Sequence, residues 1–102
     1  MAHITARPLI KNITPVAPEH LAGDLIQPGH PLFGLVWINQ DRVSGTPCFY
    51  GTRVPVKSLF DSLAAGQTLG QFLEDFDGVS REQAERTLEL AGSHMLDDLP
   101  KL

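Results

Sequence analysis

The chain has 102 residues, of which 42% are hydrophobic and 20% are charged, and its formal net charge at pH 7 is −4. This length suits one small domain with one core, and the single cysteine, Cys48, excludes an internal disulfide. No apolar run approaches the roughly 18 residues that a membrane span needs, and the N-terminal residues lack the apolar core of a secretory signal, so we expect a cytoplasmic protein.

The charge is divided unevenly along the chain. Residues 1–55 carry four basic and three acidic side chains, whereas residues 56–102 carry four basic and nine acidic ones. A nucleic-acid-binding domain usually carries a basic face, and an acidic half instead suits a partner protein with a basic surface. A solvated acidic face that keeps the protein soluble is the simpler explanation of the same composition.

Residues 1–32 contain five of the eight prolines in the chain. Proline and glycine at this density, with polar residues between them, predict an irregular or extended arm. Such an arm can be disordered alone and become ordered on a partner. We therefore place the domain proper at residues 33–102, behind a Pro-rich arm.

The stretch FGLVWIN, residues 33–39, is rich in β-branched and aromatic residues and predicts a strand. A turn follows, and CFY, residues 48–50, predicts a second short extended piece. We therefore expect residues 33–55 to form a β-hairpin, or an edge that pairs with a second copy of the chain. Aromatic side chains are common interface anchors. The residues expected at a partner or dimer interface are Val36, Trp37, Ile38, Phe49 and Tyr50.

The segment GTRVPV, residues 51–56, predicts a hinge between the hairpin and the helices. Gly51 permits a sharp turn, Pro55 ends the strand pairing, and Val56 begins the first helix. Arg53 is the side chain with a role beyond geometry. We expect it to bind a carboxylate or a group of backbone carbonyls that locks the hairpin to the helices, with DNA phosphate as the second choice.

Apolar residues recur at helical spacing in three short segments over residues 56–96, joined by short connectors. Gly66 is a natural end for the first helix. Because such helices need one another to bury their apolar faces, we expect a mainly α fold, in which a trihelical bundle with a helix-turn-helix follows a short hairpin. The second and third helices begin with predicted capping boxes, formed by Thr68 with Gln71 and by Ser80 with Gln83.

The residue types that carry catalysis are scattered along this chain. None of the four histidines has a second ligand at metal-binding spacing. Cys48 has no histidine or aspartate close in sequence to activate it, and we interpret it as a buried structural thiol. We therefore expect no enzyme, no metal and no cofactor, although a polar pocket around Cys48 or His94 would revive the enzyme hypothesis.

A helix-turn-helix would place the third helix in the major groove of DNA, where arginine reads guanine and glutamine reads adenine. Three glutamates on the same helix would repel phosphates, so basic residues in front of the bundle, doubled in a dimer, would have to contribute. A scaffold that touches no DNA explains the same residues equally well. The candidate DNA-binding residues are Arg42, Arg53, Lys57, Arg81, Gln83 and Arg86.

The stretch from Gly45 to Val56 has the pattern G-x-P-x-x-x-G-T-R-V-x-V, and it is followed by Ala-Ala-Gly at 64–66 and by Glu-Asp-Phe at 74–76. On these motifs the chain resembles the DUF433 family of small bacterial and archaeal proteins, over about residues 37–95. Two departures are Asp-Gly at 77–78, where many relatives have proline after the aromatic residue, and residues 1–34, which the resemblance does not cover.

The resemblance implies a homeodomain-like trihelical fold and an antitoxin of a type II toxin-antitoxin pair. Members of the family are commonly regarded as antitoxins encoded beside PIN-like toxins, which are thought of as metal-dependent RNases. The chain would then bind and neutralise such a toxin as a homodimer formed through its β-region, and would also regulate its own operon by binding operator DNA. An acidic half fits a basic RNA-binding rim on the nuclease. The alternative is a protein-interaction module that dimerises through its β-region and binds no DNA.

Overall fold

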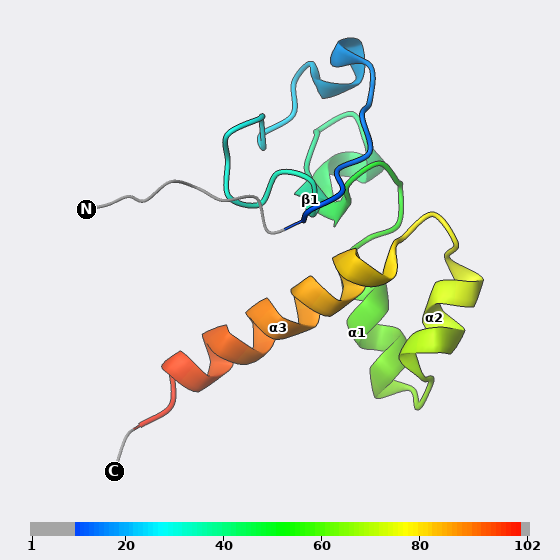
Figure 1. Ribbon diagram of the computed structural model, residues 1–102, viewed down its shortest axis with the longest axis vertical. Coiled ribbons are helices and arrows are strands. Elements are labelled where there is room, and N and C mark those ends of the chain that lie inside the picture. The colour runs from blue at the N-terminus through cyan, green and yellow to red at the C-terminus, as the bar shows by residue number, and fades with distance from the viewer. Residues whose placement is uncertain (1–9, 101–102) are drawn as a thin grey trace.

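The computed structural model describes residues 10–100, so residues 1–9 of the expected arm lie outside the described residues. Within this range, a two-stranded antiparallel sheet is followed by three α-helices, as Figure 1 shows. The predicted order of a short hairpin followed by a mainly helical part is therefore confirmed. The elements are β1 (Val36–Trp37), β2 (Cys48–Phe49), α1 (Lys57–Ala64), α2 (Leu69–Asp75) and α3 (Arg81–Asp97), with short 3-10 turns at Pro18–Leu21 and Val43–Gly45.

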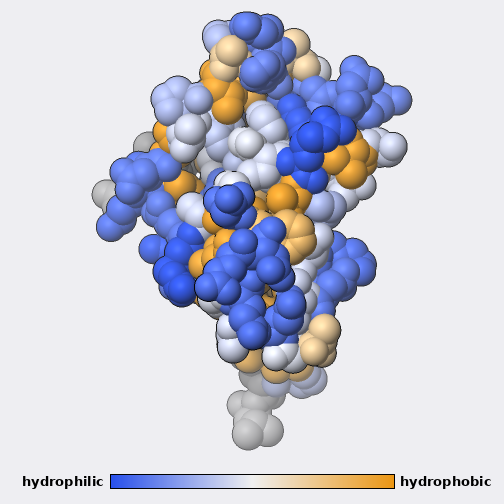
Figure 2. Space-filling model, turned by 90° about the vertical axis from the view of Figure 1, so that its right-hand side faces the viewer, coloured by the Kyte–Doolittle hydropathy of each residue, from blue (hydrophilic) through white to orange (hydrophobic). Residues whose placement is uncertain are grey.

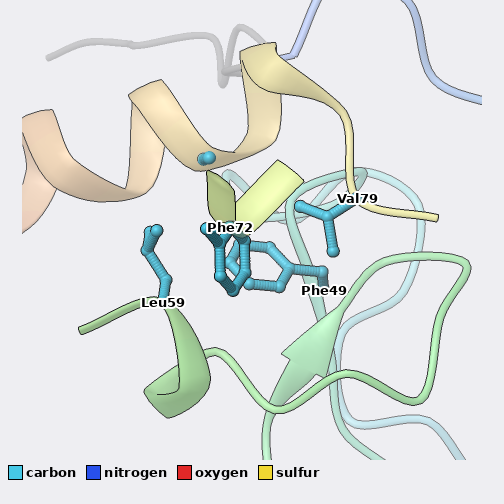
Figure 3. Packing of buried hydrophobic residues seen from close by; sticks show 5 residues of the cluster. Phe49, Leu59, Phe72 and Val79 are labelled. Atoms are coloured by element: carbon cyan, nitrogen blue, oxygen red, sulfur yellow. The ribbon is translucent and has the colours of Figure 1, made fainter. Parts of the chain in front are cut away.

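The main core lies where the helices meet the second strand. Phe49 of β2, Leu59 of α1 and Phe72 of α2 are completely buried, and Val79 closes the cluster from the connector before α3 (Figure 3). Fully burying a side chain of this kind contributes roughly 1.5–3 kcal/mol. Ala84 of α3 is the fifth buried member, so this cluster joins the sheet to all three helices.

The local signals at the helix ends are present as predicted. The hydroxyl of Thr68 accepts from the Gln71 N–H (3.1 Å), and the Gln71 side chain accepts from the Thr68 N–H (2.8 Å). Ser80 and Gln83 form the same reciprocal pair at the start of α3, at 3.0 Å each. Gly66 follows α1 with a φ of +96°. These caps determine where α1 ends and where α2 and α3 begin.

Residues 10–32 are irregular, as their prolines predict, but they are not an extended arm. The Leu25 N–H donates to the carbonyl of Ile38 (2.9 Å), which follows β1. The side-chain amide of Asn39 donates to the carbonyl of Ala22 (2.8 Å). The segment therefore folds back over the hairpin, and for these residues the expectation of an arm separate from the domain is wrong.

The hinge turns where Gly51 was expected to allow it, but strand pairing does not stop at Pro55. Gly51 has a φ of +82°, which glycine adopts without a steric penalty. Pro55 faces Cys48 in an antiparallel bridge, with main-chain hydrogen bonds on either side of this pair. Because the proline occupies a position that donates no hydrogen bond to the ladder, its missing N–H is tolerated there. The expectation that Pro55 ends the pairing is therefore wrong.

The C-terminal half of α3 extends beyond the other two helices (Figure 1). Ala84 and Thr87 in its first half are buried, whereas none of the residues from Glu89 to Asp97 is buried. The packed part of the bundle thus ends near Leu88, before the predicted end at residue 96. In the part of the chain that the structure describes, no helix combines the length and the apolar character needed to cross a membrane.

Candidate binding surfaces

Gln83, expected to read DNA, is buried at the junction of hairpin and helices. Only 7% of it is exposed, and its side-chain amide donates to the carbonyls of Gly34 (3.2 Å) and Tyr50 (3.0 Å). Its side-chain oxygen accepts from the Ser80 N–H. A carboxamide used in this way cannot also pair with a base edge. The DNA-binding assignment of Gln83 is therefore wrong. Gln83, and not Arg53 as we expected, binds the backbone carbonyls that join the hairpin to the helices.

On the hairpin side, one of the two carbonyls that Gln83 binds belongs to Gly34. Gly34 is buried and has a φ of +91°, and a Cβ built there would lie 2.7 Å from the side chain of Ile13. A larger residue would therefore force the side chain of Ile13 to move, in addition to adopting a φ that favours glycine.

Arg42 is held inside the molecule and is not free to contact phosphate. Its guanidinium forms two hydrogen bonds with the carboxylate of Asp24, at 2.8 and 3.2 Å, and the Asp24 side chain is completely buried. The guanidinium carbon also lies 3.5 Å from the centre of the Trp37 ring, in a cation–π arrangement. The DNA-binding assignment of Arg42 is therefore wrong, because its charge is neutralised while it ties the N-terminal segment to the hairpin.

Two more of the candidate DNA-binding residues, both on α3, have carboxylates beside them. Arg81 lies 3.6 Å from Glu85, and Arg86 forms an ion pair with Glu89. Such exposed pairs add little stability, but each weakens the attraction of its arginine for phosphate. The surface of α3 is therefore not the basic face that DNA recognition uses. DNA binding by Arg81 and Arg86 stays a prediction.

Most of the side chains expected at an interface belong to the core of the chain itself. Trp37, Phe49 and Tyr50 are exposed by only 7, 0 and 4%. The ring of Tyr50 lies 5.4 Å from that of Trp37, in a cluster covered by the N-terminal segment. For these three residues the interface assignment is wrong, since their side chains are already packed. Val36 and Ile38 are half-buried, and for them it stays a prediction.

Cys48 has the environment of a structural thiol. It is completely buried, and its sulfur donates to the carbonyl of Thr46 (3.4 Å). Burial raises the pKa of the Cys48 thiol above its ordinary value, and the nearby charges of Arg42 and Arg53 oppose this shift. His94 is exposed on α3, 3.5 Å from Asp98. Among residues 10–100, no group of three or more His, Cys, Asp or Glu side chains is placed to hold a metal ion.

The loop from Gly51 to Arg53 is the first candidate surface, and its backbone is held firmly. The hydroxyl of Thr52 donates to the Phe49 carbonyl (2.8 Å) and accepts from the Val54 N–H (3.0 Å). The indole N–H of Trp37 donates to the carbonyl of Thr52 (2.6 Å). Arg53 follows as an exposed residue. The loop therefore presents Arg53 to solvent from a fixed backbone.

A hollow of about 430 Å³ lies beside this loop. Arg53 and Thr52 line it from the loop, and Trp37 lines it from the hairpin. Val16 and His20 line it from the N-terminal segment. The hollow therefore exists because residues 10–32 fold back over the hairpin.

The second candidate surface lies at the free end of α3. Ala91, Met95, Leu96 and Leu99 are all exposed, the last three by 59, 60 and 49%, and we call them the α3 end surface. Ala91 and Met95 continue the apolar stripe that is buried in the first half of the helix, whereas Leu96 lies about 100° from Met95 around the helix axis and Leu99 follows the end of the helix. Carboxylates share this stretch of chain, namely Glu89, Asp97 and Asp98.

The side of the molecule that carries α2 has a different character. Figure 2 shows it covered largely by hydrophilic residues, with apolar residues visible between them. The acidic residues of α2, Glu74 and Asp75, are exposed, as is Asp77 after it. This side is a solvated polar face, whereas the α3 end surface is apolar and exposed.

A family model described as "Protein of unknown function (DUF433)" matches residues 36–91. The matched range contains both strands, α1, α2 and the first part of α3, together with the loop that carries Arg53. No curated protein and no solved structure matches the chain. The whole N-terminal segment, residues 10–32, and three of the four residues of the α3 end surface lie outside the matched range.

Proposed function

This chain belongs to the DUF433 family, and from that premise we propose that it is the antitoxin of a type II toxin-antitoxin pair. It binds and neutralises a PIN-like RNase toxin in the cytoplasm. The observation that carries the proposal is the α3 end surface, an apolar helix face with nothing packed over it among the described residues.

The packing of α3 supports a protein partner. The stripe that is buried at Ala84 continues through Leu88 and Ala91 to Met95, which is 59% exposed. Large contiguous apolar patches are uncommon on monomeric proteins and mark interaction surfaces. An amphipathic helix that lays such a stripe into a groove is a recurrent mode of protein recognition.

The charge near this stripe supports a basic partner. Asp97 and Asp98 lie on the same stretch of chain as the apolar residues, whereas Glu89 is paired with Arg86. A nuclease that binds RNA presents basic side chains around its active site, and carboxylates attract such a rim. A helix docked on that rim would exclude RNA from the nuclease, which is the effect an antitoxin must have.

Operator binding is not part of this proposal. Recognition of DNA through a helix-turn-helix needs free basic and amide side chains on the recognition helix. On α3, Gln83 is buried, and Arg81 and Arg86 have acidic neighbours. Arg53 lies before α1 and is exposed, and Lys57, the first residue of α1, is exposed but paired with Asp61. Contact of these two residues with DNA stays a prediction.

The proposal is tested by co-expressing the chain with a PIN-like nuclease encoded beside it, and by measuring co-purification and RNase activity. Met95→Asp places a charge in the apolar stripe and is expected to weaken the complex about 10-fold or more. Its melting temperature should be unchanged, because the side chain is exposed.

Ser93→Asp is the matched control, because Ser93 is exposed on the same helix and lies opposite the stripe through Ala91 and Met95, next to Leu96. It should leave the complex intact. A wild-type chain that neither co-purifies with the nuclease nor lowers its activity would overturn the proposal. If the wild type and Met95→Asp bound the nuclease equally well, the apolar stripe of α3 would not form the contact.

A further inference from the structure

We propose that the hollow beside Arg53 is a binding site for a small organic anion, whose carboxylate or phosphate pairs with Arg53 and whose apolar part lies against Val16 and Trp37. The site is separate from the α3 end surface and does not depend on the toxin.

The charge on Arg53 is the first argument. Arg42, Arg81 and Arg86 each lie within ion-pair distance of a carboxylate. Arg53 is the one arginine among residues 10–100 without such a neighbour. A guanidinium matches the two oxygens of a carboxylate or phosphate with parallel N–H donors. The structure thus leaves the guanidinium of Arg53 available for an anion, at the edge of a hollow.

The fixed loop is the second argument. Its backbone is held by both hydrogen bonds of the Thr52 hydroxyl and by the indole N–H of Trp37. A group presented from a fixed backbone loses less conformational entropy when it binds a ligand, and this favours affinity.

The composition of the hollow is the third argument. Its volume of about 430 Å³ falls in the range of small-molecule sites. Val16 and Trp37 provide an apolar wall, and the charge of Arg42 is neutralised by Asp24. Arg53 therefore supplies the net positive charge, with His20 at the same hollow. A free inorganic ion would leave the apolar wall unused.

The two parts of the site have different origins in the chain. Arg53, Thr52 and Trp37 lie within the range matched by the family model, whereas Val16 and His20 come from the preceding segment. The anion-binding part thus belongs to the shared domain. The apolar wall combines both origins, because Trp37 lies in the matched range and Val16 in the preceding segment.

Isothermal titration calorimetry of the full chain, without any toxin, tests the proposal with four probes. Adenosine monophosphate carries a phosphate and benzoate carries a carboxylate, each on a flat body. Adenosine lacks the anion, and inorganic phosphate lacks the body. We expect adenosine monophosphate or benzoate to bind, and adenosine and inorganic phosphate each to bind about 10-fold more weakly or worse.

The variant Arg53→Gln should weaken binding of the favoured probe by about 10- to 100-fold, and Arg53→Lys should restore part of it. The matched control is Arg86→Gln, which removes the same charge from α3 and should bind as the wild type does. Binding of adenosine monophosphate alone identifies a phosphate ligand, and binding of benzoate alone identifies a carboxylate ligand. The inference would be overturned if neither adenosine monophosphate nor benzoate bound. It would also be overturned if Arg53→Gln and Arg86→Gln weakened binding of the probe equally.

Discussion

At the scale of single residues, Gln83 and Gln71 show how one side chain acquires a second role from its surroundings. Both stand at the third position of a helix and complete a capping box. Gln71 is exposed, whereas Gln83 is buried and also donates to two main-chain carbonyls of the hairpin region. The same residue type in the same local motif is thus only a cap in α2 and a link between two parts of the molecule in α3.

This difference leads to a paired prediction. Gln71→Ala removes only a cap and should lower the free energy of unfolding by about 0.5–1 kcal/mol. Gln83→Ala removes the same cap and leaves the carbonyls of Gly34 and Tyr50 without their partner, so it should cost about 2–4 kcal/mol. Urea denaturation of the two variants measures both values. Equal losses would show that the two carbonyl contacts add nothing to stability.

At the scale of elements, the N-terminal segment is joined to the hairpin by a buried ion pair. Asp24 and Arg42 form it, with side chains that are 0 and 11% exposed. Breaking a buried pair by removing one partner is costly, because the other charge stays buried without compensation. The pair therefore holds residues 10–32 over the hairpin and preserves the hollow beside Arg53.

We predict that Asp24→Ala lowers the free energy of unfolding by about 3–5 kcal/mol. The matched comparison is Asp61→Ala, which breaks the exposed pair of Asp61 with Lys57 on α1. That variant should lose about 0.5 kcal/mol or less. The urea midpoints of the two variants test this contrast. A small effect of Asp24→Ala would mean that residues 10–32 stay in place without the pair.

The helix α3 is the other element whose two halves differ. Its first half is bound into the core through Ala84 and Thr87, and its second half is exposed. Helix propensity and the cap at Ser80 favour the helical conformation of all of α3, but tertiary packing stabilises only its first half. A partner that covers the α3 end surface would supply packing where the chain alone provides none.

At the scale of the whole molecule, the two buried titratable groups of the hairpin region make stability sensitive to alkaline pH. Burial raises the pKa of Cys48 above 9.0 and that of Tyr50 above 10.0, and the charge of Asp24 adds to the rise for the Tyr50 pKa. In the unfolded chain these groups ionise first. The unfolded state then binds fewer protons than the folded state, so the free energy of unfolding falls as pH rises.

We therefore predict that the contribution of these two groups is fully present below pH 9 and is lost progressively above it, first as the Cys48 thiol ionises in the unfolded chain. The loss from one group approaches about 1.4 kcal/mol per pH unit at most. Unfolding by urea at several pH values measures the slope. Cys48→Ala should be less stable at neutral pH and show a smaller slope between pH 9 and 10. An unchanged slope would contradict the role of the thiol.

The sequence by itself determined the features that depend on neighbours close along the chain. The two capping boxes span four residues each, and the apolar spacing predicted the helices and the short hairpin before them. The G-x-P-x-x-x-G-T-R-V-x-V pattern, from Gly45 to Val56, pointed to the family. These signals are local, because turns, caps and helical periodicity follow from φ and ψ and from side chains three or four positions apart.

Only the tertiary structure decided what the functional candidates do. Gln83 meets Gly34 from 49 residues away, and Arg42 meets Asp24 from 18 residues away. The composition around Trp37 predicts that its ring is covered, but not whether the N-terminal segment or a second chain covers it. Burial and pairing are set by contacts between distant parts of the chain. The spacing of residues along a sequence does not specify those contacts, and they left Arg53 exposed while enclosing Arg42 and Gln83.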